Sequence, residues 1–233
     1  MLFNANGIDM TSSKEKLEEH GVAMSMDAFY AQMVEMNLRN SIFIDCTATY
    51  DIPTYYQSIL RQSISIVTPN KVACSSHFDH YLDLKKTATK YHAPFLFETN
   101  VGAGLPVIST AGDLLKSGDK VSRIEAVLSG TLNFLFNHYD ATVPFQEVLK
   151  RAKDEGYTEP DPKIDLSGID VQRKILILVR ESGHKLELDE IQNRSFLPDD
   201  CLETQTVEEL YKRLLEHEDH FKQLFKKANE QGK

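Results

Sequence analysis

Residues 41–71 read SIFIDCTATYDIPTYYQSILRQSISIVTPNK, and the predicted fold class follows from this segment. Its two short apolar runs, residues 42–46 and 64–67, are bounded by polar residues, which is typical of buried strands. Between them, Pro53 begins a helical pattern that continues to about residue 62. A strand, a helix and a second strand in this order predict a βαβ unit whose two strands run parallel.

The alternation of strands and helices continues on both sides of this unit. A helix is predicted from residue 75 to about residue 91, and a third strand over residues 95–97. Residues 14–37 carry two helical patterns, and Ser25 is a candidate N-cap for the second. Strands that alternate with helices favour a parallel sheet with both faces covered, so we expect an α/β fold for residues 1–100.

The pattern changes after residue 100, where we place a domain boundary. Residues 105–115 are predicted to form a helix and residues 121–128 a strand, and helices predominate from Thr131 onward. Charged and apolar residues alternate at helical spacing over residues 207–231, which predicts a pair of surface helices. Residues 101–233 are therefore expected to form a second, α+β domain.

The composition is that of an ordinary globular protein and excludes several classes. Of the 233 residues, 41% are hydrophobic and 26% charged, and the net charge is −9. That charge argues against non-specific nucleic-acid binding, which needs a basic surface. No apolar stretch is long enough to span a bilayer, and the start MLFNANGIDM lacks the features of a secretory signal. Cys46, Cys74 and Cys201 are isolated, so we expect a reduced cytoplasmic protein without disulfides or a zinc site.

Residues 156–174 read GYTEPDPKIDLSGIDVQRK and combine an acidic loop with the start of a helix. The prolines after Glu159 and Asp161 force extended backbone, which stiffens the loop. Asp170 and Lys174 are four residues apart, so they project from one face of the helix. Carboxylates placed in this way could hold the ammonium group of a small amino acid, and the lysine could serve a reacting oxygen. The alternative is an ordinary solvated ion pair, and spacing alone does not separate the two.

Candidate ligand-binding residues follow the first two predicted strands at the point where each strand ends. Thr47 and Ala48 follow the first strand, and Lys71 lies in the TPNK segment after the second. Ligands of open α/β sheets bind at the carboxyl ends of the strands, so these residues are candidates for a ligand site. A lysine just past a strand is also commonly a solvated loop residue, and the pattern leaves both interpretations open.

The segment ETNVGAGLP at residues 98–106 carries two glycines shortly after Glu98. Glycine permits left-handed backbone, and the carbonyls that such a turn exposes suit a cation that prefers oxygen ligands. The alternative is a plain strand-to-helix turn in which glycine serves only the backbone shape.

Two histidine pairs, His77/His80 and His217/His220, have i, i+3 spacing. Each pair lies in a charged amphipathic stretch without a third ligand. Solvated helix faces are therefore favoured over metal sites at both places.

Several of these segments resemble those of one family. GYTEPDP followed by DLSGxDVxxK resembles the substrate-site signature of homoserine dehydrogenases. The segments TPNK, ETNVGAGLP and VLSGT (residues 127–131) are also similar to parts of these enzymes. From NGID (residues 6–9) onward, the sequence looks most like the dehydrogenase half of bifunctional aspartokinase–homoserine dehydrogenases. Ile164 and Gln172 depart from the family pattern, in which an acidic residue and an alanine are common at these positions.

The resemblance implies a role for each candidate residue. Lys174 and Lys71 would be catalytic and would stabilise and protonate the developing alkoxide, with Asp165 supporting Lys174. The substrate would be bound by Gly156, Glu159, Asp165 and Asp170, and the cofactor by Thr47, Ala48 and Lys71. A monovalent cation such as sodium would be held by Glu98 and by the carbonyls of Val101, Ala103 and Leu105.

The implied activity is the reduction of L-aspartate 4-semialdehyde to L-homoserine with NADPH or NADH, in threonine and methionine biosynthesis. The implied fold is a Rossmann-like parallel sheet followed by an α+β substrate and dimerisation domain. Because the chain has no GxGxxG turn, we expect the sheet to be partial and the chain to be truncated at both ends. A homodimer and fusion to an aspartokinase are further implications. The alternative is an inactive fragment that acts only as a dimerisation or interaction module.

Overall fold

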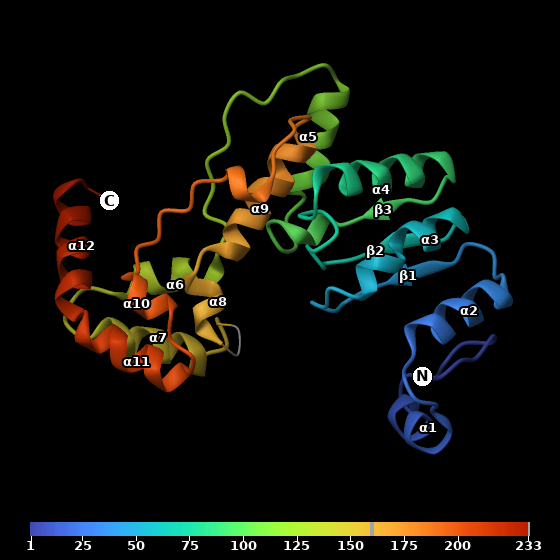
Figure 1. Cartoon of the computed structure of the whole chain (residues 1–233), viewed down its shortest axis with the longest axis horizontal. Helices are drawn as coiled ribbons and strands as arrows, with labels where there is room; N and C mark the ends of the chain where they lie inside the picture. Colours follow the sequence, from blue (N-terminus) through green and yellow to red (C-terminus); the bar gives the residue numbers. More distant parts are fainter. Residues whose placement is uncertain (159–160, 233) are drawn as a thin grey trace. The chain divides into compact units, whose positions relative to one another are not determined.

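The computed structural model describes residues 1–158 and 161–232, and the chain divides into two compact units (Figure 1). The first unit is Met1–Gly104 and the second is Leu105–Lys233. Each helix of the described residues is too short or too polar to cross a membrane.

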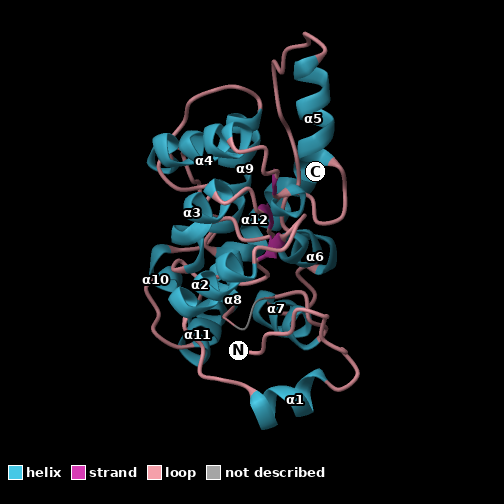
Figure 2. Ribbon diagram, turned by 90° about the vertical axis from the view of Figure 1, so that its right-hand side faces the viewer, coloured by secondary structure: helices cyan, strands magenta, loops and turns pink. Residues whose placement is uncertain are grey.

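Three short parallel strands form the sheet of the first unit (Figure 2). β1 (Ile42–Ile44) pairs with β2 (Ser65–Val67), and β2 pairs with β3 (Phe95–Leu96). The register places Phe43 opposite Ile66, and Ile66 opposite Phe95. The predicted order of three parallel strands is confirmed.

The two crossovers contain the predicted helices. β1 and β2 are connected by η1 (Ile52–Tyr55) and α3 (Tyr56–Arg61). The proline at the second position of η1 favours the start of this 3₁₀ turn, which continues directly into α3. α4 (Phe78–Lys90) connects β2 with β3. It begins three residues later than predicted, since residues 72–76 form turns.

The helices of this unit cover one face of the sheet, not both faces as the sequence pattern suggests. Phe43 and Ile66 point to the covered face and are buried. On the opposite face, Ile42, Ile44 and Leu96 are 58%, 64% and 54% exposed. The expectation of two covered faces is wrong for this unit taken by itself. Side chains alternate between faces, so an apolar run places apolar residues on both sides whether or not a helix covers them.

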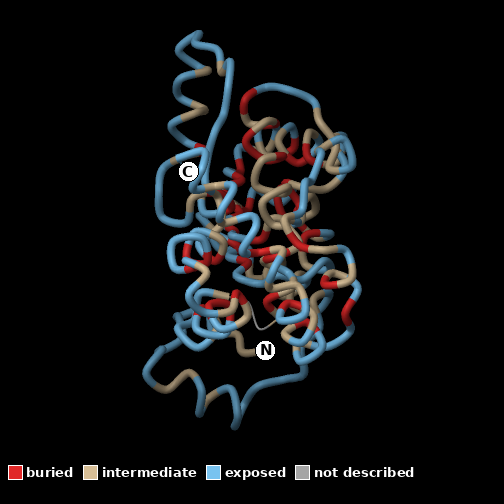
Figure 3. The backbone as a smooth tube through the Cα atoms, turned by 90° about the vertical axis from the view of Figure 1, so that its left-hand side faces the viewer, coloured by how far each residue is buried: buried red, intermediate tan, exposed pale blue. Residues whose placement is uncertain are grey.

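Two helices precede the sheet, as predicted. α1 (Ser13–His20) contains no buried residue (Figure 3). α2 (Met26–Met36) begins at the predicted cap, because the Ser25 hydroxyl accepts a hydrogen bond from the amide of Ala28 at 3.3 Å. Phe29 of α2 packs edge-on against Phe43 of β1, with 6.1 Å between the ring centroids, which joins α2 to the sheet.

The second unit is helical over its described residues. In chain order it contains α5 (Val107–Lys116), α6 (Gly130–His138), α7 (Phe145–Asp154), α8 (Pro162–Leu166), α9 (Ile169–Glu181), η3 (Leu188–Glu190), α10 (Asp199–Leu202), α11 (Val207–Glu216) and α12 (Glu218–Glu230). The predominance of helices after Thr131 is confirmed.

The core of the second unit joins helices that are far apart in the sequence. Phe145 and Leu149 of α7, Leu210 of α11 and Phe221 of α12 are all buried in one cluster. The rings of Phe145 and Phe221 are stacked, with 4.3 Å between their centroids. The predicted helix pair over residues 207–231 is therefore present, and its apolar face belongs to the core.

The prediction of a strand over residues 121–128 is wrong. This segment has no regular secondary structure, and Val127 is 78% exposed. An extended segment becomes a strand only when a neighbouring strand pairs with its backbone groups, and the described residues of this unit contain no such neighbour.

Glu218 at the start of α12 caps the N-terminus of α7. It does so by bonding Phe145, which is 73 residues earlier in the sequence. One carboxylate oxygen accepts a hydrogen bond from the Phe145 amide at 2.8 Å, and the other accepts one from the Tyr139 hydroxyl at 2.9 Å. Pro144 offers no side-chain cap there. A carboxylate at a helix N-terminus both satisfies a free amide and faces the positive end of the helix dipole.

We predict that Glu218→Ala lowers the free energy of unfolding by about 1–3 kcal/mol, because it leaves a buried amide and a tyrosine hydroxyl without their acceptor. Asp219→Ala is the matched control, since Asp219 is the exposed acidic neighbour in the same helical turn. Urea unfolding followed by circular dichroism measures both variants. Equal stability of the two would show that Glu218 is not a cap.

Candidate functional site

A buried carboxylate lies at the carboxyl end of β1. Asp45 is 2% exposed and accepts three hydrogen bonds from different segments. The Thr47 amide donates to Oδ1 at 2.7 Å, while the Tyr56 hydroxyl and the Asn70 amide group donate to Oδ2 at 2.6 and 3.2 Å. Buried charges are tolerated when they are hydrogen-bonded in this way.

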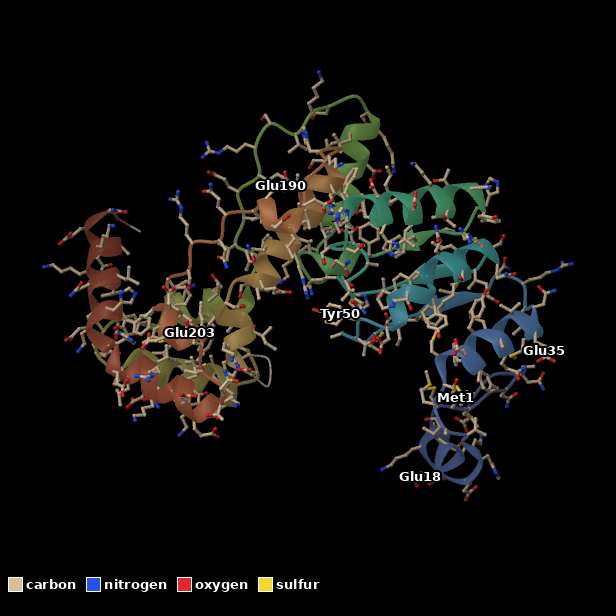
Figure 4. The ribbon with its side chains drawn as sticks, viewed as in Figure 1. Met1, Glu18, Glu35, Tyr50, Glu190 and Glu203 are labelled. Atoms are coloured by element: carbon tan, nitrogen blue, oxygen red, sulfur yellow. The ribbon has the colours of Figure 1, made fainter. Side chains whose placement is uncertain are left out.

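The segments that follow β1 and β2 are also joined through Thr68. Its hydroxyl donates to the backbone carbonyl of Asp45 at 2.9 Å and accepts from the Asn70 amide at 2.9 Å. The Asn70 side chain donates a second bond to the Thr49 carbonyl at 2.9 Å. Tyr50, labelled in Figure 4, is the next residue of the same loop. The two loops at this edge of the sheet therefore form one hydrogen-bonded assembly.

Asn100, which follows β3, is hydrogen-bonded to the loop after β2 at the same edge of the sheet. Asn100 is fully buried in η2 (Glu98–Asn100). With its amide oriented so that both ends find partners, it donates to the carbonyls of Thr68 and Pro69 at 3.2 and 2.8 Å. All three strands thus contribute to the arrangement at their carboxyl ends.

The predicted cofactor residues lie on these loops. Thr47 and Ala48 are exposed, and Lys71 is half-buried. The Lys71 carbonyl accepts hydrogen bonds from the amide and the hydroxyl of Ser75, at 2.9 and 2.8 Å. The backbone that presents these residues is therefore held in place, while Thr47 and Ala48 face outward.

Asp45 is missing from the residues predicted as site residues. The signal was an acidic residue directly after the apolar run of β1, inside a predicted strand. Burial alone would raise the pKa of Asp45, but hydrogen bonds from Tyr56, Thr47 and Asn70 outweigh it and hold that pKa below its ordinary value. Burial, and then the bond to Asp45, raises the pKa of Tyr56, so its hydroxyl remains a donor at neutral pH.

The predicted cation turn begins at η2 and continues into the unit boundary after Gly104. Val101 is fully buried, and the backbone is left-handed at Gly102 (φ +81°) and Ala103 (φ +52°). The sharp turn that the glycines suggest is therefore present. The convergence of carbonyls from Val101, Ala103 and Leu105 near Glu98 stays a prediction.

In the second unit, the predicted substrate segment begins where α7 ends. Gly156 is left-handed (φ +78°), a conformation that suits glycine at a helix end. Glu159 lies outside the described residues. Asp161 is extended as predicted, but its side chain accepts a hydrogen bond from the Lys163 amide at 3.0 Å and caps α8. The short helix α8 is not predicted from the sequence.

Thr131 joins the two sides of this acidic loop. It is 4% exposed, and its hydroxyl lies within hydrogen-bond distance of two oxygens. These are the Tyr157 carbonyl at 2.6 Å and Oδ1 of Asp165 at 2.8 Å. Tyr157 precedes the loop and Asp165 follows it, so one buried hydroxyl on α6, with a single proton to donate, lies between acceptors on both sides of the loop.

Lys174 makes two polar contacts. Its Nζ lies 2.7 Å from Oδ2 of Asp170 and donates to the Leu128 carbonyl at 2.6 Å. The side chains of Lys174 and Asp170 are 17% and 37% exposed. A lysine this shielded, with a backbone acceptor 46 residues away, differs from the ordinary solvated ion pair that the spacing leaves open.

Lys174 and Asp165 both contact residues 128–131, at the start of α6. The Leu128 carbonyl accepts a hydrogen bond from Lys174, and the Thr131 hydroxyl donates to Asp165. The structure therefore gathers Asp165, Asp170 and Lys174 around the start of one helix. Lys71 belongs to the first unit, and its predicted meeting with Lys174 in one pocket stays a prediction.

The second histidine pair does not lie on a fully solvated helix face. His217 and His220 are both half-buried. His217 Nε2 lies 2.9 Å from both oxygens of Asp200, and His220 Nε2 lies 2.8 Å from the Phe196 carbonyl. Each histidine has its own protein partner: His217 contacts α10, and His220 contacts the segment that precedes α10.

Asp200, Cys201 and His217 offer ligand atoms that lie within 4.8 Å of one another. The Asp200 carboxylate is, however, paired with His217 and lies 4.0 Å from Nε of Arg213. Burial raises the pKa of Cys201 to about 11, so its thiol is protonated at neutral pH. A neighbouring cation and a protonated thiol both disfavour a metal ion at this place.

Comparison with protein families identifies two matching models. One, described as the NAD-binding domain of homoserine dehydrogenase, matches residues 4–98. The other, described as homoserine dehydrogenase, matches residues 106–233. The two matches together span both units.

Relatives and solved structures agree with these models. The chain is 44% identical over 220 residues to the chloroplastic bifunctional aspartokinase/homoserine dehydrogenase 2 of Arabidopsis thaliana, covering 94% of this chain and 24% of that protein. A crystal structure of a Candida auris protein of unknown function matches with a TM-score of 0.82 and 31% identity, over 93% of this chain and 62% of that one. A hyperthermophilic archaeal homoserine dehydrogenase in complex with NADPH matches with a TM-score of 0.63 and 26% identity, over 80% of this chain and 61% of that one. The chain thus spans about a quarter of the bifunctional relative.

We predict that Thr131→Val lowers the free energy of unfolding by about 1–3 kcal/mol, because it removes the buried hydroxyl that lies between the Tyr157 carbonyl and Asp165. Thr131→Ser keeps the hydroxyl and is the matched control. Hydrogen exchange at the Tyr157 and Asp165 amides should become faster in the valine variant only. Equal exchange rates in both variants would contradict a role for the hydroxyl in holding these two segments.

A second prediction concerns pH. The pKa of Asp45 is lowered in the folded state, so its contribution to stability is present above the ordinary value of 3.8 and is lost as the pH falls through the folded-state pKa. The stability difference between the wild type and Asp45→Asn should therefore shrink as the pH falls below about 4. Urea unfolding at a series of pH values measures it. A difference that stays constant down to pH 2.5 would contradict the assignment.

Proposed function

The chain belongs to the homoserine dehydrogenase family, and we propose that it carries out the NADPH-dependent reduction of L-aspartate 4-semialdehyde to L-homoserine. The observation that carries this proposal is the setting of Lys174. It is shielded from solvent, paired with Asp170 and bonded to the Leu128 carbonyl. A lysine fixed in this way is a suitable proton donor for an oxygen that becomes an alkoxide.

The second unit would hold the substrate. Glu159 and Asp170 would bind its ammonium group and set its orientation, with Gly156 and Asp165 completing the binding loop. Lys174 would face the carbonyl oxygen and deliver the proton, and Lys71 would be a second catalytic residue that stabilises developing alkoxide charge. The bonds from Thr131 support this proposal, because they hold Asp165 and the start of the loop.

The first unit would hold the nicotinamide end of the cofactor at the carboxyl edge of the sheet. Thr47, Ala48 and Lys71 follow β1 and β2 there, which is where open α/β sheets bind ligands. The bound nicotinamide would supply the hydride. The residues of the chain would orient it and exclude alternative positions. The match to an NADPH complex favours NADPH over NADH as the cofactor.

We further propose a monovalent cation, such as sodium, at the turn after β3. The ligands would be Glu98 and the carbonyls of Val101, Ala103 and Leu105. The left-handed backbone at Gly102 and Ala103 supports this, since it turns successive peptide groups sharply. A homodimer and fusion to an aspartokinase in the parent protein belong to the same proposal.

The second candidate is an interaction module without activity of its own. The exposed apolar residues Ile42, Ile44 and Leu96 favour it, because an uncovered apolar sheet face is a surface for association. The two candidates differ in whether the chain binds NADPH. Titration followed by nicotinamide fluorescence separates them.

We predict that Lys174→Ala lowers kcat by about 10²- to 10³-fold, as expected for loss of one group that stabilises the developing charge. Lys212→Ala is the matched control, since Lys212 forms an exposed i, i+4 pair with Glu216. NADPH oxidation with L-aspartate 4-semialdehyde measures turnover, and thermal unfolding checks stability. Turnover of Lys174→Ala close to that of the control would contradict the assignment. Absence of both turnover and NADPH binding in the wild type would favour the interaction module.

A further inference from the structure

We propose that Asp45 is a positioning residue, whose carboxylate holds the Thr47 loop and the Lys71 loop in the arrangement that receives the cofactor. The proposal rests on the proposed function of this edge of the sheet. Asp45 itself is buried, so it would act through the groups it bonds and not by touching the cofactor.

The hydrogen bonds of Asp45 lead in different directions. Oδ1 of Asp45 serves the Thr47 amide in the loop after β1, and Oδ2 serves Asn70 in the loop after β2. Tyr56, at the start of α3, donates to the same Oδ2. One carboxylate therefore links two loops and the helix between them.

Asn70 in turn holds the backbone around Lys71. The Asn70 side-chain oxygen accepts a hydrogen bond from the Val72 amide at 3.0 Å, so Asn70 spans Lys71 on its own loop. The Lys71 carbonyl is held by Ser75 on the other side. The Lys71 backbone is thus fixed between Asn70 and Ser75, and Asn70 is fixed by Asp45.

An ionised carboxylate at position 45 is required to accept all three of these hydrogen bonds. Thr47, Tyr56 and Asn70 all present donors, and only a carboxylate offers acceptors on both oxygens. An asparagine at position 45 could still accept from Thr47, but its NH₂ group would face the NH₂ group of Asn70. The Asn70 loop would then lose the bond that ties it to β1 and keep its bonds to Thr49 and Thr68. The volume of the side chain at position 45 would be almost unchanged.

The test compares Asp45→Asn with Asp83→Asn, the same change at an exposed position of α4. Hydrogen exchange is measured at the Thr47, Asn70 and Val72 amides, with Leu84 of α4 as an internal reference. NADPH affinity is measured by fluorescence. We expect Asp45→Asn to speed exchange at Asn70 and Val72 but not at Leu84, and to weaken NADPH binding by about tenfold or more. Asp83→Asn should change neither.

A second variant, Asn70→Ala, keeps the test decisive if Asp45→Asn does not fold. It cuts the link to Lys71 and leaves the Asp45 bonds to Thr47 and Tyr56 intact. Exchange should rise at Val72 and stay unchanged at Thr47, with weaker NADPH binding. Unchanged exchange at Val72, or loosened loops with unchanged NADPH affinity, would overturn the proposal. If the wild type binds no NADPH, the proposed function fails for this chain, and the exchange pattern still decides whether Asp45 holds the loops.

Discussion

The need of buried polar groups for hydrogen-bond partners is the constraint on which both candidate sites depend. At the edge of the sheet, the Asp45 carboxylate is removed from water and draws donors from the loops after β1 and β2. In the second unit, the buried hydroxyl of Thr131 is the donor, and it lies between acceptors on the two sides of the acidic loop. In each case a single buried group determines where exposed, chemically useful residues are presented.

The two sites differ in how their lysines are held. The Lys71 backbone is fixed by Asn70 and Ser75, so the position of its loop is set by neighbours in the sequence and by Asp45. The Lys174 side chain is itself fixed, by Asp170 one turn earlier and by the Leu128 carbonyl from a distant segment. A proton donor benefits from a fixed side chain, whereas a residue at a cofactor edge benefits from a fixed backbone.

Features with a local cause were predictable from the sequence, and features with a distant cause were not. The strands follow from apolar runs, and the cap at Ser25 follows from a serine before a helical pattern. The strand at residues 121–128 failed because a strand depends on a partner that the pattern does not contain. The helix α8 was missed although Asp161 followed by proline is a cap followed by a first helical residue. The role of Thr131 was not readable, because its partners lie 26 and 34 residues away.

We propose that the carboxyl edge of the sheet in the first unit receives the nicotinamide cofactor. An NMR titration of the ¹⁵N-labelled chain with NADPH tests this proposal, because each amide reports its own environment. We expect saturable shifts that are largest at Thr47, Ala48 and Lys71 and small over α11 and α12. Shifts that are absent, or that concentrate on α11 and α12, would show that the cofactor does not bind at this edge.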